Sequence, residues 1–434
     1  SNKFNSRWVF SKKYNPINET LRFLLFVFIP LFVFLISYLK FNNNETLKVN
    51  PYSREFFLRK KILIFNDSKI INKITFILLT IITFDFLIID FKLHIFELDI
   101  FHEGTPLVPP TNYFFKNSFW LSTLYDYGFG GNNLGLLMSK ITDHHSIGSI
   151  RFAKLFLIFL NKILLVFICR KLSINLNFDK NIKGIFFILL SLLIVGFINY
   201  TAPAISYYPP RTCIFLLFIL FTVDTLISKN SSFLNAFIVG IFSLVSILWW
   251  IDIGIYINAI IIIVCIYLIL QKEYLKICYI FTGILSAWFI FLIYFPLNEI
   301  KEFFYQIKFI LSISGYLLGI EYPTPFSAHS IRETKALLFV IFSGIFVIIL
   351  NFNKKINLDF STKIIISVLF ISSIIFFQTS MMRSDAPHIK ASSGSYMFIF
   401  YFGLLYFIFY NLQKLKFMIY FKKFSSNYIL IMFV

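Results

Sequence analysis

Two carboxylates that could do chemistry lie four residues apart, Asp99 and Glu103 in the stretch LDIFHEG, with His102 beside the second. On a helix, residues at this spacing share one face, so both acids would reach the same small volume. A carboxylate in such a place can act as a general base that accepts the proton of an attacking hydroxyl. The two acids are also the residues that would hold Mg²⁺ or Mn²⁺ if a metal takes part, although no third protein ligand is evident and no cofactor is firmly predicted.

Three residues have the chemistry of phosphate recognition. The stretch MMRSDAPH carries Arg383 and His388, and Arg211 follows YYPP at the start of an apolar run. The planar guanidinium binds a phosphate through two parallel hydrogen bonds, and histidine can donate or transfer a proton near neutral pH. We predict that these residues bind the phosphate of a donor substrate. The alternatives are an ordinary surface Arg–Asp pair in MMRSDAPH and, for Arg211, a side chain that snorkels to the membrane surface.

Six further residues are predicted to line a substrate cavity because they bring polar or aromatic groups to the expected outer boundary of the membrane. They are His102, Asp126, Tyr127, Asp85, Asp385 and Trp250. Asp85 falls inside an apolar run, where a carboxylate is rare enough to be a functional candidate. Trp250 could stack on a sugar, although tryptophans at a membrane boundary usually act as anchors. For any single acid the ordinary interpretation is a solvated side chain.

The composition indicates the class of protein that must position these groups. Of the 434 residues, 58% are hydrophobic, only 14% are charged and 60 are phenylalanine, which excludes a water-soluble globule. The formal net charge is +19. In a membrane chain a basic excess collects in cytoplasmic loops. We therefore interpret the charge as a topology signal and expect membrane lipid, not nucleic acid, as the partner.

The apolar runs predict an all-α fold, a polytopic bundle of about 11–12 transmembrane helices, since a span needs roughly 20 apolar residues. The predicted spans are 21–39, 74–91, 150–169, 184–203, 212–228, 233–250, 253–270, 277–296, 336–351, 361–378, 396–411 and an incomplete span at 417–434. The aromatic and polar residues 113–127 predict an interfacial helix in the first long outer loop, 92–149. Gly104 and Pro106 are expected to end a helix that continues from the second span through Glu103.

Lysine and arginine in short loops give the predicted orientation. The basic loops 170–183, 351–363 and 411–416 are expected in the cytoplasm, and the alternate loops 92–149, 204–211, 251–252, 297–335 and 379–395 outside. All six histidines fall in these outer loops. The predicted chemistry therefore lies at the outer face of the membrane.

The chain divides into a basic N-terminal segment, 1–73, and a transmembrane domain, 74–434. Both the first residues and the loop 40–73 are basic, so both cannot be cytoplasmic if 21–39 crosses the membrane once. Pro30 would allow a kinked or re-entrant segment, which leaves the path of this span open. Because the last apolar run is incomplete, we expect the C-terminus to be truncated.

The outer loop LDIFHEG…PTNYFFKNSFWLSTLYDYG and the late MMRSDAPHIKASSG resemble the GT-C superfamily of integral-membrane glycosyltransferases, over residues 74–411. The departures are the basic segment 1–73, which has no place in the pattern, and the absence of the proline that often follows DYG. The resemblance implies transfer of a sugar from a polyprenyl-phosphate donor to a hydroxyl of a glycan, lipid or protein. It further implies a bacterial inner membrane, an active site facing the periplasm or exterior, and Asp99 as the base with Glu103 assisting.

Three other classes of protein remain. A lipid-linked oligosaccharide polymerase or ligase shares outward arginine and histidine loops, but such enzymes rest less on an early acidic loop. A transporter or flippase would show inverted repeats and charges along a central path. The third class is a structural or sensory membrane protein in which the acidic loop has no catalytic role.

Overall fold

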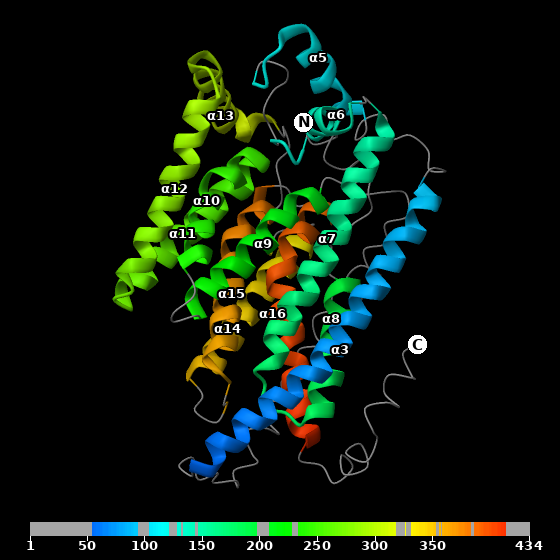
Figure 1. The fold of residues 1–434 in the computed structure, drawn as a ribbon, viewed down its shortest axis with the longest axis vertical. Coiled ribbons are helices and arrows are strands. Elements are labelled where there is room, and N and C mark those ends of the chain that lie inside the picture. Colours follow the sequence, from blue (N-terminus) through cyan, green and yellow to red (C-terminus); the bar gives the residue numbers. More distant parts are fainter. Residues whose placement is uncertain are drawn as a thin grey trace. The chain divides into compact units, whose positions relative to one another are not determined.

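The structure is a computed structural model, and every element in its described residues is a helix (Figure 1). It describes residues 54–93, 104–120, 128–131, 133–143, 146–197, 208–227, 233–317, 326, 331–352, 356, 358–382 and 386–413. The predicted all-α fold is confirmed. The described helices are those of a polytopic membrane protein.

The chain forms two compact units. Unit 1 comprises Ser1–Thr80, Val166–Ile198 and Tyr322–Val434, and unit 2 comprises Ile81–Leu165 and Asn199–Glu321. Two long helices, α3 (Arg54–Leu93) and α7 (Ile147–Ile174), contribute to both units.

Unit 1 is built on α8 (Lys180–Phe197), α14 (Ile331–Phe352), α15 (Phe360–Met382) and α16 (Ala386–Gln413). Helix α16 packs against each of the other three. Aromatic rings form much of the contact: Phe178 stacks on Tyr406, and Phe186 meets Phe402 edge to face. The ring contact of Phe178, which lies between α7 and α8, brings this predicted cytoplasmic connection to the later turns of α16.

Unit 2 is built on α9 (Tyr208–Ile227), α10 (Phe233–Trp249), α11 (Ile251–Leu270), α12 (Tyr274–Tyr294) and α13 (Leu297–Leu317). Helix α10 is central and packs on α9, α11 and α12. The segment before α7 adds a 3-10 turn, η1 (Thr105–Leu107), and two short helices, α5 (Val108–Lys116) and α6 (Leu134–Thr142). Phe86, in the part of α3 that belongs to unit 2, stacks on Phe159 of α7.

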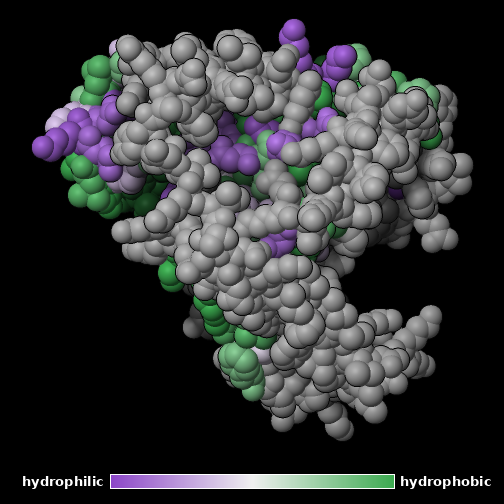
Figure 2. All heavy atoms as spheres, turned by 90° about the horizontal axis from the view of Figure 1, so that it is seen from below, coloured by the Kyte–Doolittle hydropathy of each residue, from purple (hydrophilic) through white to green (hydrophobic). Residues whose placement is uncertain are grey.

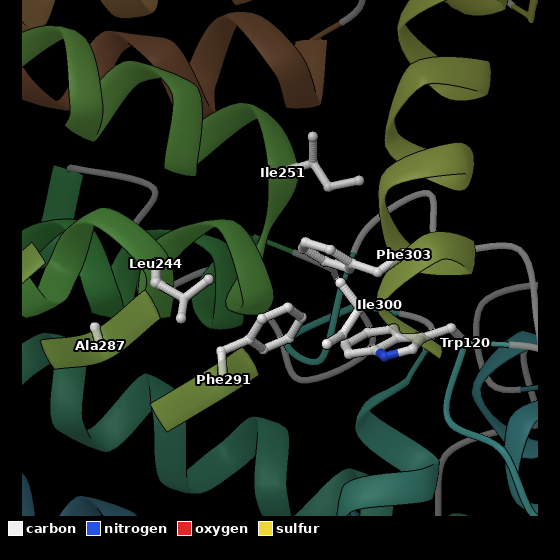
Figure 3. Close-up of a cluster of buried hydrophobic side chains, with 7 residues drawn as sticks. All are labelled: Trp120, Leu244, Ile251, Ala287, Phe291, Ile300 and Phe303. Carbon is white, nitrogen blue, oxygen red and sulfur yellow. The ribbon is translucent and has the colours of Figure 1, made fainter. Parts of the chain in front are cut away.

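A buried aromatic cluster joins the segment before α7 to the helices of unit 2. Trp120 is fully buried and contacts the rings of Phe291 and Phe303, which come from α12 and α13 (Figure 3). Leu244, Ile251, Ala287 and Ile300 complete the cluster. Gln306 of α13 also donates a hydrogen bond to the backbone carbonyl of Trp120. The cluster thereby fixes the described part of the first predicted outer loop to the end of α12.

Five described helices are long and apolar enough to cross a membrane: Lys69–Ile88, Ile147–Ile174, Ile251–Leu270, Tyr274–Tyr294 and Phe360–Phe377. Four shorter apolar helices cover 181–196, 233–249, 334–350 and 397–412. Many of their large apolar side chains are exposed, and hydrophobic side chains lie at the surface beside hydrophilic ones in Figure 2. In water this would be costly, whereas in a bilayer such faces contact lipid.

Ten of the predicted spans coincide with a helix, from α3 to α16. The other two, 21–39 and 417–434, lie outside the described residues. Nine of the ten overlap one of the apolar helices named above. The tenth coincides with α9, which carries both Arg211 and Asp224 and is not one of those apolar helices.

Several predicted helix ends differ from the structure, and some predicted loops are largely helical. Of the interfacial helix expected at 113–127, residues 113–116 belong to α5, which ends there because Asn117 adopts a left-handed conformation with φ of 49°. Residues 121–127 lie outside the described residues. Gly104 has a helical conformation and directly precedes η1, and Pro106 sits at the start of η1, where its missing N–H costs nothing. The helix that these two residues were expected to end would occupy residues 94–103, which lie outside the described residues. Helix α13 occupies much of the loop expected at 297–335, α16 begins inside the one expected at 379–395, and α3 begins inside the basic loop 40–73.

Candidate functional site

Four segments meet at one end of unit 2, which we call the Arg211 end. They are the start of α9, the α10–α11 junction, the α12–α13 junction and described parts of residues 104–143. Backbone hydrogen bonds join Phe129 to Leu248, and ring contacts join Trp120 to Phe295. All four segments belong to loops predicted to face outward or directly border them. The expectation that these loops share one side therefore agrees with the packing inside unit 2.

The glycine-rich sequence GFGG, residues 128–131, caps the C-terminus of α10. The amides of Phe129 and Gly130 donate to the carbonyls of Leu248 and Trp249, both at 2.9 Å. These carbonyls belong to the last turn of the helix, where no intrahelical donor is available. Gly128 has φ of +76°, and a Cβ there would lie 2.6 Å from the Trp249 carbonyl oxygen. Only glycine allows this approach at position 128.

Arg211 forms an ion pair with Asp252 in the centre of this end. Pro209 and Pro210 begin α9, where proline favours a helix start, and this places Arg211 in the first turn. Its side chain is 8% exposed and that of Asp252 is 37% exposed. Arg211 is therefore buried and held, and the alternative of an arginine that snorkels freely to the membrane surface does not describe it.

Asp252 is anchored at the start of α11. Its Oδ1 accepts a hydrogen bond of 2.7 Å from the amide of Ile253, while Oδ2 faces Arg211. A carboxylate in the first turn is stabilised by the positive end of the helix dipole. The acid is thus fixed by its own helix and in turn fixes the arginine, which lies 41 residues earlier in the chain.

Trp250 lies between α10 and α11 and is 2% exposed. The guanidinium carbon of Arg211 lies 5.7 Å from the centre of its ring, a cation–π contact. Because the side chain is buried, Trp250 does not serve as a lipid-facing belt anchor. Its indole supports Arg211 from the side.

The residue after Arg211 on α9, Thr212, makes a second polar contact. Thr212 is buried, and its hydroxyl accepts a hydrogen bond of 3.1 Å from the amide of Asn161 on α7. Buried polar groups in an apolar bundle are costly unless paired, so this contact fixes the rotation of α9 about its axis. Arg211 is thereby directed at the α10–α11 junction.

Asp85 lies in α3, inside the predicted span 74–91. It forms an ion pair of 2.5 Å with Lys162, joining α3 and α7 within the two predicted spans. A charge inside a membrane protein is stabilised when an opposite charge accompanies it. The described ion pair of Asp85 thus links helices α3 and α7. It provides no support for the prediction that Asp85 lines a substrate cavity.

Most other predicted site residues lie outside the described residues: Asp99, His102, Glu103, Asp126, Tyr127, Arg383 and Asp385. His388 lies in the first turn of α16, and its side chain is likewise outside the description. Asp126 and Tyr127 directly precede Gly128 in the chain. Of the eleven residues singled out, the described part brings together Arg211 and Trp250 and sets Asp85 in a separate ion pair.

Asp252 lies in the predicted outer loop 251–252 but is not among the site residues predicted from the sequence. A signal for it exists: it is an acid in the first turn of a strongly apolar helix, directly after two tryptophans. Trp120 was also missed, because one tryptophan among many aromatic residues does not show that it forms a core.

The Arg211 end offers a guanidinium held by a carboxylate and an indole. Such a group can bind an anion, and phosphate can replace or join the carboxylate as its partner. Within the described residues, no group of three histidine, cysteine or acidic side chains could hold a metal. No family model, curated protein or solved structure matches the chain.

Proposed function

We propose that this protein is a bacterial inner-membrane glycosyltransferase of the GT-C type. It transfers a sugar from a polyprenyl-phosphate donor to the hydroxyl of a glycan, lipid or protein at the outer face of the membrane. The observation that carries the proposal is the buried Arg211, paired with Asp252 at the end of unit 2 that receives described parts of loop 92–149.

The chemistry of Arg211 supports a phosphate-bearing lipid. A cation at the start of a transmembrane helix can meet a lipid phosphate while the apolar chain stays in the bilayer. Asp252 keeps the guanidinium oriented when no donor is bound, and Trp250 limits its rotation. The donor phosphate then competes with one carboxylate, which provides a binding site without an unpaired buried charge in the empty protein.

The sequence supports a division of roles. Asp99 accepts the proton of the acceptor hydroxyl, and Glu103 orients that acceptor or assists a metal. Arg383 and His388 complete the charge around the departing phosphate. Stabilising this negative charge lowers the barrier, since the phosphate leaves as an anion.

The test uses the full chain in lipid nanodiscs with a panel of polyprenyl-phosphate sugars. Release of polyprenyl phosphate measures transfer to an added acceptor or, more slowly, to water. Asp99→Asn and Glu103→Gln remove charge but keep shape, so at least one should lower turnover by about 10²-fold or more. Parent turnover in both variants would show that this acidic loop is not catalytic. Sugar that crosses sealed vesicles without chemical change would identify a transporter instead.

The same assay tests the phosphate site. Arg383→Lys keeps the charge but loses the planar fork, so donor use should weaken while insertion persists. For Arg211 the suitable variant is Arg211→Leu combined with Asp252→Leu, because it leaves no unpaired charge. Unchanged donor affinity in both the Arg383 variant and this double variant would remove the phosphate-binding assignment.

A further inference from the structure

Helix α13 carries one exposed stripe that the proposed function does not use. Lys301, Phe304, Tyr305, Lys308 and Phe309 recur at helical spacing, and all five are exposed. We call this set the lysine–aromatic face. Residues on the other side of the helix, Ile300, Phe303 and Gln306, are buried against the cluster of Trp120. The orientation of α13 is therefore fixed by packing, and the exposed stripe is a consequence of it.

The face continues a surface that contacts lipid. Phe304 stacks on Trp288 of α12, with ring centres 6.0 Å apart and planes 9° apart. Trp288 lies about 9 Å before the end of α12. At this level α12 exposes Phe289, Ile290 and Ile293, on a helix apolar enough to span the membrane. The aromatic residues of α13 thus begin beside the last turns of a membrane-spanning helix.

The charges on the face have one sign. Lys301 and Lys308 flank Tyr305, which is 62% exposed and stacks on Phe309 with ring planes 13° apart. The acids of the helix lie elsewhere: Glu299 is buried, and Glu302 accepts a hydrogen bond from Gln306. Exposed lysines beside exposed aromatic side chains are typical of the headgroup region.

We propose that the lysine–aromatic face binds the headgroups of anionic phospholipids in the bilayer around the protein. The aromatic rings lie at the boundary of the hydrocarbon, and Lys301 and Lys308 pair with lipid phosphates. Charge complementarity and continuity with the apolar face of α12 favour an anionic lipid over a protein partner. The inference is independent of glycosyl transfer and holds whatever reaction the protein performs.

The test places a photo-crosslinking amino acid at position 305 in the full chain, in nanodiscs of equal parts phosphatidylglycerol and phosphatidylcholine. Mass spectrometry of the crosslinked lipid should show phosphatidylglycerol enriched about fivefold for each lysine, as expected for a basic residue near an anionic surface. Lys301→Gln with Lys308→Gln should return the ratio to that of the bulk lipid. Both lysines are exposed, so thermal unfolding should be unchanged.

Two matched controls make the result specific. Lys272→Gln removes a lysine that is also exposed, at the other end of α12, and should leave the enrichment at position 305 unchanged. The crosslinker at Leu285, 67% exposed in the middle of α12, should capture the two lipids in their bulk ratio. Absence of lipid at position 305, capture of a second protein copy, or an enrichment that survives the double lysine variant would each overturn the proposal.

Discussion

The pair Arg211–Asp252 shows how a single charge is accommodated near a membrane boundary. Removing one member of a buried pair leaves the other uncompensated and is costly, whereas replacing both by apolar residues is often neutral. The two members differ here. Arg211 is almost fully enclosed, while Asp252 is more exposed and has a second partner in the amide of Ile253.

This asymmetry predicts an order of stabilities. Asp252→Leu should destabilise most, by about 3 kcal/mol, because it removes the opposite charge from beside the enclosed guanidinium. Arg211→Leu should cost less, since the carboxylate keeps its backbone partner, and the double variant should be the mildest. Thermal unfolding of the purified chain in detergent measures the order. A single Asp252→Leu variant as stable as the parent would mean that the guanidinium does not depend on this carboxylate.

At the scale of residues, the sequence showed which charged residues occupy unusual positions, but it did not show which residues they pair with. An arginine after YYPP was recognisable as a special position because of its cost in an apolar run. Its partner lies 41 residues away and depends on how α9 and α11 pack, which no local pattern encodes. Asp85 was recognised in the same way, yet its partner Lys162 makes it a tie between helices.

At the scale of elements, α10 and α12 of unit 2 pack closely against each other, and two glycines explain how their backbones can approach. A Cβ on Gly240 would lie 2.0 Å from the carbonyl oxygen of Ile280, and one on Gly283 would lie 2.1 Å from that of Phe237. Each glycine therefore lets the opposite backbone approach. Small residues at crossings are a usual way for helices to pack in membranes, where burial from water contributes little.

Gly240→Ala and Gly283→Ala should each destabilise the protein by about 1–3 kcal/mol, because the obstructing atoms belong to the backbone and cannot rotate away. The matched control is Gly196→Ala in α8, where a Cβ would meet nothing within 4 Å. Alanine favours a helix over glycine, so this control should be neutral or slightly stabilising. Unfolding midpoints of the three variants in one detergent compare them. Equal midpoints for Gly240→Ala and the control would contradict the close crossing.

Apolar periodicity and length were enough to predict the ten described helices that coincide with predicted spans, because a bilayer demands long apolar helices wherever it is crossed. Within the described part of the predicted interfacial helix, the chain is helical as far as Lys116, because the left-handed Asn117 ends α5. Helix α13 was missed because its mixed charged and aromatic sequence resembles a solvated loop when the buried stripe Ile300, Phe303 and Gln306 is not known. An amphipathic segment of this kind can be recognised as a helix only when the neighbours against which its buried side packs are known.

At the scale of the whole molecule, the remaining prediction concerns sidedness. Inside unit 2 the start of α9, the α10–α11 junction and the segment before α7 meet at the Arg211 end. Gln271 and Asn298 lie beyond opposite ends of α12, which is long and apolar enough to span a bilayer. The two residues should therefore face opposite aqueous compartments.

Charge bias assigns the compartments. Basic loops stay in the cytoplasm during insertion, so the loop 170–183 should be inside and the Arg211 end outside. Single cysteines at the exposed positions Lys116, Asn298, Gln271 and Asn177, in a chain whose exposed Cys278 is serine, allow a direct measurement. A membrane-impermeant maleimide should label Lys116→Cys and Asn298→Cys in intact cells. It should label Gln271→Cys and Asn177→Cys only after the membrane is opened.

Each outcome of this labelling has a definite meaning. If Gln271→Cys and Asn298→Cys react from the same side, α12 does not cross the membrane and the predicted topology fails. If the whole pattern is reversed, the helices span but the Arg211 end faces the cytoplasm, and the proposed donor site at the outer face is excluded. The predicted pattern would place Arg211 and the loop before α7 on the side where an outward-facing polyprenyl-phosphate donor is presented. The proposed chemistry therefore depends on which side of the membrane the Arg211 end faces.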